Sequence, residues 1–365
     1  MFKHPDVLIV GGGVIGLTAA YFLAREGLTV EVLDKGNLGA EASWAGAGII
    51  PPGNPENAAT PYDWLRATSS RMYPALSAEL DEAVGIDNGY RACGGIEYLE
   101  PSDRDTIPAW EAEGIAFEPY PSAAERAYLL SGMAQVRNPR HLRALIGVCQ
   151  KRQVRLSPGV AVARIERAES SVTGVRLMSG ELRLAGRYVV AAGAWSEAIL
   201  EPLGLKTGIH PVRGQIVLLK TAAPSLQRIL LVGKNYLVPR EDGHVLIGAT
   251  EEPEAGFEKR TTAEAIAGLI ELGTALVPEL RKAEMVKCWA GLRPGSLDGL
   301  PSIGRAAPFR NLFLAGGHYR AGIQLSPATA QVLTELLTER PPSIPLDDFR
   351  PGRSPGKPFR SAFRS

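Results

Sequence analysis

DVLIVGGGVIGLTAAYFLAREGLTVEVLD, residues 6–34, has the pattern of two buried strands joined through a glycine-rich turn and a helix. DVLIV is a continuous apolar run, as in a parallel strand that is covered on both faces. TAAYFLAREG has helical spacing and ends at Gly27, and LTVEVLD repeats the apolar pattern of a strand. The stretch therefore predicts a strand–helix–strand unit and, with it, a parallel α/β sheet.

The glycines of this unit form the pattern GxGxxG through Gly11, Gly13 and Gly16, and Asp34 follows 18 residues after the third glycine. The first glycine permits a tight turn, the second lets the backbone approach a pyrophosphate, and the third lets helix and strand pack closely. The pyrophosphate would lie at the helix N-terminus, and Asp34 would accept hydrogen bonds from the adenosine ribose. The alternative is a glycine-rich turn that is only structural. The pattern favours a dinucleotide, but NAD and FAD share it.

Later apolar runs predict two sheets. RYVVAAGAWSEAIL at 187–200 and NLFLAGGHYRAGIQL at 311–325 end in small residues and lead into helices, as further strands of the first parallel sheet would. The segments between them are β-type runs separated by turn signals, which predict a second, mostly antiparallel sheet inserted into the first domain. These runs are GYRACGGIEYLEP (89–101), HPVRGQIVLLK (210–220), RILLVGKNYLVPRE (228–241), GHVLIGATEEP (243–253) and MVKCWAGLRP (285–294).

Composition and charge limit the function classes. The chain has 365 residues, of which 45% are hydrophobic and 22% charged, and its net charge is +1, as expected of a folded enzyme of one large or two-part body. We expect no nucleic-acid or membrane partner, because no clustered basic surface is indicated. The N-terminus lacks the pattern of a signal peptide, which favours a cytoplasmic protein.

Several kinds of site are disfavoured. There is no GxSxG or HExxH motif, so hydrolytic chemistry is poorly supported, and we expect no metal site because the five histidines lack ligand spacing. The three cysteines are far apart and predict neither a disulfide framework nor a zinc site. His141 and His244 are expected at the surface or as caps.

Three cationic or aromatic residues lie near glycines in predicted strand ends and turns. They are Tyr236 in KNYLVPR, Arg293 in WAGLRPG and Arg320 in GGHYRAG. Solvated turn charges are one interpretation. The other is a carboxylate clamp, because an arginine binds a carboxylate through two parallel N–H bonds. The helix predicted after Arg320, GIQLSP, could direct N–H groups at a flavin carbonyl.

The chain resembles the FAD-dependent D-amino acid oxidase superfamily and, within it, the glycine oxidases associated with thiazole formation in thiamine biosynthesis. VLIVGGGVIGLTAAYFLAREG and VVAAGAWS carry the superfamily pattern. ASWAGAGII (42–50), NYLVPREDGHVLIGAT, CWAGLRPGSLDGLPSIGR and GHYRAGIQLSPATA are similar to glycine oxidases. The resemblance covers residues 6–340.

The resemblance implies an α/β fold, with a Rossmann-type (glutathione-reductase-like) FAD-binding domain and an inserted, mostly antiparallel substrate-binding domain. We expect residues 1–85, 140–207 and 300–340 in the first domain, 86–139 and 208–299 in the second, and 341–365 as a flexible tail. The implied reaction is oxidative deamination of glycine, sarcosine and small D-amino acids by hydride transfer to flavin N5, with oxygen as acceptor and hydrogen peroxide as product. The resemblance also implies a homo-oligomer and possible transfer of the imine to a thiazole synthase.

Site residues follow from the matching motifs. Tyr236 matches an active-site tyrosine, Arg293 the arginine that pairs with the substrate carboxylate, and Arg320 a second active-site arginine. The expected FAD contacts are Gly11, Gly13, Val14, Ile15, Gly16, Asp34, Lys35, Ser43, Ala47, Gly48, Ile49, Val162, Ala192, Gly193, Trp195, Gly291, His318, Arg320, Ala321, Gly322 and Ile323. Gly291 stands where related sarcosine oxidases have a flavin-linked cysteine, and Cys288 lies three residues earlier, so the FAD is expected to be non-covalent.

Departures from the family pattern concern the substrate. Lys234, Pro51 and Glu251 stand where one branch has histidine, glycine and methionine, which puts substrate breadth in doubt more than reaction type. A D-amino acid dehydrogenase with a quinone or carrier as acceptor is the main alternative. A flavin-binding module without turnover and a tRNA-modifying flavoprotein are further ones.

Overall fold

The first sheet of the molecule has six strands, in a computed structural model that describes residues 4–122, 126–356, 359 and 363. The strand order is β18 (Ser302–Arg305), β19 (Leu312–Gly316), β12 (Arg187–Val190), β1 (Val7–Val10), β2 (Val30–Leu33) and β8 (Arg155–Ser157). All neighbours are parallel except β18 and β19. The predicted first unit and both later runs are thus confirmed as members of one sheet.

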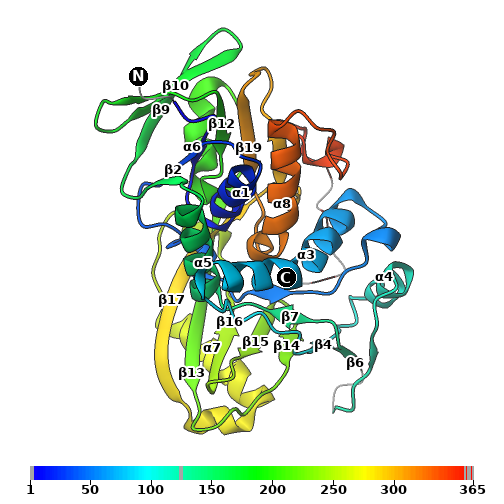
Figure 1. Ribbon diagram of the computed structural model, residues 1–365. Helices are drawn as coiled ribbons and strands as arrows, with labels where there is room; N and C mark the ends of the chain where they lie inside the picture. The colour runs from blue at the N-terminus through cyan, green and yellow to red at the C-terminus, as the bar shows by residue number, and fades with distance from the viewer. Residues whose placement is uncertain (1–3, 123–125, 357–358, 360–362, 364–365) are drawn as a thin grey trace.

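Helices cover one face of this sheet and a small sheet covers the other (Figure 1). The helices are α1 (Val14–Arg25), α5 (Asn138–Lys151) and α8 (Gly322–Leu337), and α3 (Pro61–Val84) packs on α8 and α5. The opposite face of the six-stranded sheet packs against α6 (Ser196–Leu200) and a small antiparallel sheet. That small sheet consists of β9 (Val162–Ala168), β10 (Ser171–Leu177) and β11 (Leu182–Arg183). Strand β1 is buried at every position because both of its faces are covered.

The second sheet has eight strands and lies in the lower half of Figure 1. Its order is β17 (Glu284–Gly295), β13 (His210–Lys220), β16 (His244–Gly248), β15 (Asn235–Pro239), β14 (Ile229–Val232), β4 (Gly95–Tyr98), β6 (Ala127–Leu130) and β5 (Glu118–Pro119). Only the β14–β4 pair is parallel, which confirms the expected mostly antiparallel sheet. Helix α7 (Ala263–Leu276) packs on one face.

Shorter elements connect these layers. They are α2 (Ala42–Ala45), α4 (Thr106–Glu113), the pair β3 (Ile49–Ile50) and β7 (Ala134–Gln135), and 3₁₀ turns at Pro55–Asn57, Gly193–Trp195, Glu201–Leu203, Pro253–Ala255, Pro278–Lys282 and Asp347–Phe349. The six-stranded sheet uses strands from both ends and the middle of the chain, while the eight-stranded sheet uses strands between residues 95 and 295. We retain the predicted domain boundaries as a proposal.

The C-terminal segment, expected to be a flexible tail, contacts the body at separate points while most of its described residues are exposed. Ile344 and Phe349 are buried, and Arg353 donates two hydrogen bonds to the Asp298 carboxylate, both at 2.8 Å. The Phe359 ring lies 4.8 Å from that of Tyr62. The buried apolar side chains alternate with exposed prolines and charged residues, so these contacts are local, and the flexibility of the segment stays a prediction. The remainder of the expected tail lies outside the described residues.

His141 is fully buried in α5, and the expectation of a surface or capping role is wrong. Its Nδ1 lies 3.1 Å from the Asn88 amide nitrogen. Burial lowers its pKa to about 4, so the imidazole is neutral at neutral pH. His244 is partly exposed and lies 2.8 Å from Asp242 Oδ1, as a surface residue would.

We expect the free energy of unfolding to fall as the pH decreases from about 6.5 toward 4, because the unfolded chain binds a proton at His141 that the folded chain excludes. The contribution of this residue at pH 5 is about 2 kcal/mol. Urea unfolding of the wild type and of His141→Gln between pH 5 and 8 measures it. The substituted protein should lose less stability on acidification, and parallel curves for the two proteins would contradict the assignment.

Among the described residues, every helix is too short or too polar to span a membrane, and no three or more histidine, cysteine or acidic side chains are grouped so that they could hold a metal ion.

Candidate active site

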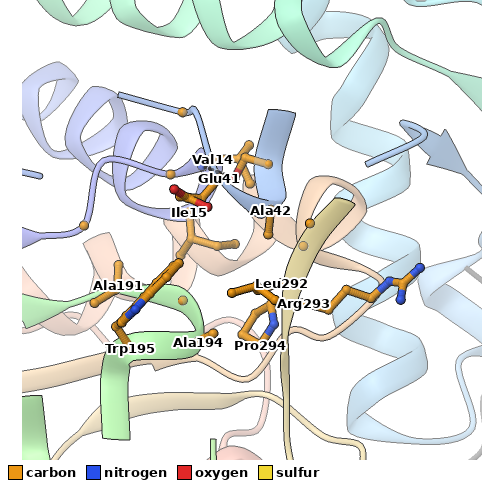
Figure 2. Close-up of a pocket in the computed structure, with 18 of the residues that line it drawn as sticks. Val14, Ile15, Glu41, Ala42, Ala191, Ala194, Trp195, Leu292, Arg293 and Pro294 are labelled. Atoms are coloured by element: carbon orange, nitrogen blue, oxygen red, sulfur yellow. Dashed lines mark hydrogen bonds between the residues drawn. The ribbon is translucent and has the colours of Figure 1, made fainter. Parts of the chain in front are cut away.

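A cavity of about 470 Å³ extends from the glycine-rich turn after β1 to residues of the eight-stranded sheet. It begins at the carboxyl ends of β1, β2 and β12, where α/β sheets commonly bind ligands. Its volume lies in the range of small-molecule sites. Figure 2 shows Trp195 on one side and the Arg293 side chain reaching away on the other.

The glycine-rich turn has no room for a side chain at its first and third motif glycines. Gly11 has φ of +112°, and a Cβ there would lie 2.3 Å from the Ala191 carbonyl oxygen. A Cβ on Gly16 would lie 1.9 Å from the Gly11 carbonyl oxygen. The turn therefore leaves its backbone directly exposed to the cavity at Gly11 and Gly13.

The N-terminus of α1 faces the same end of the cavity. Helix α1 carries no acidic residue in its first turn, so its partial positive charge is left for an anion. The Val14 N–H donates to Ser43 Oγ at 2.9 Å. Each Asp34 carboxylate oxygen accepts one backbone bond, from the Gly12 and Gly36 N–H groups, both at 2.8 Å. Both oxygens keep further acceptor capacity.

A strap from the second sheet's domain, residues 253–260, covers this end of the cavity. The Phe257 ring lies 5.6 Å from the Trp195 ring, and Lys259 Nζ lies 2.8 Å from Glu41 Oε2. Lys35 Nζ lies 3.4 Å from the Trp195 ring centroid, and burial lowers the pKa of this lysine. Because Lys35, Glu41 and Trp195 line the cavity, the strap adds a second layer over its wall.

At the opposite end, Tyr236 on β15 and Arg293 on β17 line the cavity. Tyr236 is buried, which raises its pKa, while Arg293 acts in the opposite direction. Arg293 Nη1 donates to the Thr250 carbonyl at 3.0 Å. Gly214 and Gly248 make room for these side chains, since a Cβ there would lie 2.3 Å from Arg293 Nη1 and 2.6 Å from Tyr236 Oη. One neutral donor and one cation thus lie together at this end.

Arg320 lines the cavity beside these two residues but already has partners. Its Nη2 donates to the Lys234 carbonyl at 2.8 Å, and its Nη1 lies 3.8 Å from Glu251 Oε2. Tyr319, with φ of +48°, donates its hydroxyl to the other Glu251 oxygen. Burial and the charge of Arg293 lower the pKa of Arg320.

Helix α8 begins at Gly322, two residues after Arg320, as predicted. Gly322 and Ile323 line the cavity, so the N-terminus of α8 faces it. His318 lies in the wall before this helix, 3.1 Å from Thr329 Oγ1. Burial lowers the pKa of His318 to about 3, which leaves a neutral ring there at physiological pH.

The structure brings nearly all the predicted site residues to this cavity. Only Gly16 and Ala321 do not line it; Gly16 packs beneath the turn and Ala321 is buried before α8. The motifs missed Glu41, Gly214 and Tyr319, which do line it. The glycine in HPVRGQIVLLK is a usable signal for Gly214, because a glycine inside a strand marks a close approach.

Gly291, the position where related enzymes have a flavin-linked cysteine, lies apart from the nearby Cys288. Gly291 lines the cavity, whereas Cys288 packs with the cluster beside α7, on the other face of the eight-stranded sheet. Its Sγ lies 3.9 Å from Thr261 Oγ1. Neither position offers a thiol to the cavity.

Comparisons with known proteins agree with this geometry. The family model described as FAD dependent oxidoreductase (DAO) matches residues 6–336. A glycine oxidase of Pseudomonas aeruginosa is 39% identical over 94% of this chain and 98% of its own length. A bifunctional ThiO/ThiG protein of Synechocystis is 33% identical over 97% of this chain and 54% of its own length. The crystal structure of glycine oxidase from Geobacillus kaustophilus superposes with a TM-score of 0.90 at 31% identity, covering 97% of this chain and 100% of that one.

Proposed function

Because this chain belongs to the DAO family of FAD dependent oxidoreductases, we propose that it oxidises glycine to glyoxylate, ammonia and hydrogen peroxide. The observation that carries the proposal is that the dinucleotide-type glycine turn lines the same cavity as Tyr236 and Arg293. Glycine oxidases are among its relatives over almost the whole chain. Sarcosine and small D-amino acids have the same amine and carboxylate groups and are further substrates of this proposal.

The residues present fit FAD. The backbone at Gly11, where a side chain is excluded, and at Gly13, where none is present, can approach a pyrophosphate at the N-terminus of α1. Asp34 has acceptor capacity for the ribose, and Val162 lies in the wall near it. The start of α8 would face the flavin, and Gly291 also lines the cavity. No thiol lines the cavity at Gly291, which supports non-covalent binding.

The substrate end would bind the carboxylate of the amino acid. Arg293 supplies a planar, permanently charged donor set, and the Tyr236 hydroxyl adds an oriented donor. Fixing the carboxylate at this end directs the substrate Cα–H toward the flavin end of the cavity. When bound, FAD supplies the acceptor for the Cα hydrogen as hydride and returns the electrons to oxygen.

The remaining chemistry needs no acid or base from the chain. A neutral substrate amine donates its lone pair as the Cα–H bond breaks, which yields the imine. Water then hydrolyses the imine to glyoxylate and ammonia. His318, the histidine in the cavity wall, is neutral and buried, as expected of a residue that only forms part of the wall.

The deciding experiment is anaerobic mixing of the purified yellow protein with glycine, followed by air. Loss of the visible flavin absorbance, then its recovery with release of peroxide, is the expected result. Loss without recovery in air would indicate a dehydrogenase that uses a quinone or another carrier. No loss with glycine but loss with D-alanine or D-proline would retain the family and change the substrate.

The fate of the imine is a further part of the proposal. ThiO/ThiG proteins join a region similar to this chain to another region in one polypeptide. We propose that this enzyme passes its imine to a thiazole synthase, and that it acts as a cytoplasmic homo-oligomer. Co-purification with such a synthase and the mass of the purified enzyme in solution test these two points.

A further inference from the structure

Glu251 lies behind the second arginine of the substrate end. One of its carboxylate oxygens accepts a hydrogen bond from the Tyr319 hydroxyl, and the other lies 3.8 Å from Arg320 Nη1. Tyr319 and Arg320 line the cavity, whereas Glu251 is not part of the wall and its side chain is 35% exposed. Glu251 therefore contacts the site only through these two residues.

The two arginines at the substrate end, Arg293 and Arg320, differ in whether a carboxylate lies beside them. Arg293 has no carboxylate partner among its described contacts, and its Nη1 donates to a carbonyl. Arg320 has Glu251 beside it. The neighbouring Glu252 is bound to Arg213 at 2.6 Å, in a separate ion pair that also includes Glu258. Arg293, Arg320 and Glu251 together carry a net charge of about +1, which matches a substrate with one carboxylate and a neutral amine. The further cation near Tyr236, Arg240, donates to the Val136 and Ala47 carbonyls.

We propose that Glu251 is a positioning residue that restricts the substrates to amines with a single carboxylate. This inference rests on the proposed function. Glu251 neutralises Arg320, which also donates to the Lys234 carbonyl, and is itself held by the Tyr319 hydroxyl. A second substrate carboxylate near Arg320 would meet the negative charge of Glu251 and lose the cation that it needs.

The substitution Glu251→Gln isolates the charge, because glutamine keeps an acceptor for the Tyr319 hydroxyl. Glu254→Gln is the matched control, since Glu254 is an exposed carboxylate three residues further along the same segment. The probes are N-(carboxymethyl)glycine, which has two carboxylates, and N-(carbamoylmethyl)glycine, its neutral analogue of nearly the same shape. Comparing them separates charge from size.

In Glu251→Gln, the kcat/KM ratio of the dicarboxylate to its amide should rise by on the order of tenfold, the effect of one unit charge over several ångströms at intermediate dielectric. Glu254→Gln should leave the ratio unchanged. An equal rise of the ratio in both variants would mean that any lost negative charge on this segment has the same effect, which would overturn the proposal. An unchanged ratio in Glu251→Gln would overturn it as well.

Binding provides a second measurement that needs no turnover. Malonate and malonamate are titrated into the oxidised FAD-loaded protein and followed by the change in flavin absorbance. Glu251→Gln should bind malonate more tightly relative to malonamate, again by on the order of tenfold. If the variant has lost turnover, this ratio decides the proposal. If the wild type does not oxidise glycine, the proposed function fails, while the malonate comparison still tests the role of Glu251.

Discussion

Arg293→Ala is expected to raise KM for glycine by on the order of 100-fold, because the substrate carboxylate loses its charged partner in a partly buried site. Arg293 lies in β17 opposite Val212 of β13, and its guanidinium lies over Gly214. The strand pairing fixes the base of the side chain, so the alanine variant should keep its fold. Steady-state oxygen consumption at varied glycine concentration measures the effect.

Two further variants make the result interpretable. Arg293→Lys keeps the charge but loses the planar pair of donors, so it should recover only part of the affinity. Arg260→Ala removes an exposed arginine whose partner is Glu258 and should leave KM unchanged. A wild-type KM in Arg293→Ala would remove Arg293 from the carboxylate site, and a lower kcat with unchanged KM would assign it to the chemical step.

Gly11→Ala is expected to yield a protein that purifies without FAD. A Cβ at Gly11 would lie 2.3 Å from one backbone atom and 2.5 Å from another of Ala191, and φ at this position is +112°. Neither the neighbouring strand β12 nor the turn can move without disturbing the sheet. We expect the free energy of unfolding to fall by at least about 2 kcal/mol. The ratio of visible to ultraviolet absorbance and a urea titration measure the two effects.

Gly268→Ala is the matched control. Gly268 lies in α7, a Cβ there would have no heavy atom within 4 Å, and its φ is not in the left-handed region. Alanine should therefore stabilise this helix slightly and leave FAD binding unchanged. A yellow, fully loaded Gly11→Ala protein would show that the turn tolerates a side chain and that the pyrophosphate does not depend on it.

The sequence could predict the parts of the fold that depend on local patterns. The first unit, the later strands β12 and β19, and the runs of the second sheet were all predicted, because each has its own apolar period and turn signals. The cavity residues near Gly11, Arg293 and Arg320 were predicted because they belong to motifs. In these places local pattern and final packing agree.

Other features depend on contacts between distant residues. His141 follows a proline at a helix start, which indicates a cap, yet its side chain meets Asn88, more than 50 residues earlier in the chain. The C-terminal segment has a composition typical of a mobile end, yet its Arg353 forms an ion pair with Asp298. Glu251 could be recognised as a departure from the family, while its contacts with Tyr319 and Arg320 required the structure.

The cavity takes its walls from both ends of the chain, near residues 10–15 and near residues 315–323. On the ribosome these two regions emerge at opposite ends of synthesis, and β19 can join β12 only after residue 316 has left the exit tunnel. A nascent chain that already displays the complete GxGxxG motif therefore still lacks the far wall. A product truncated before residue 315 is therefore expected to retain FAD poorly, because part of the cavity wall is missing.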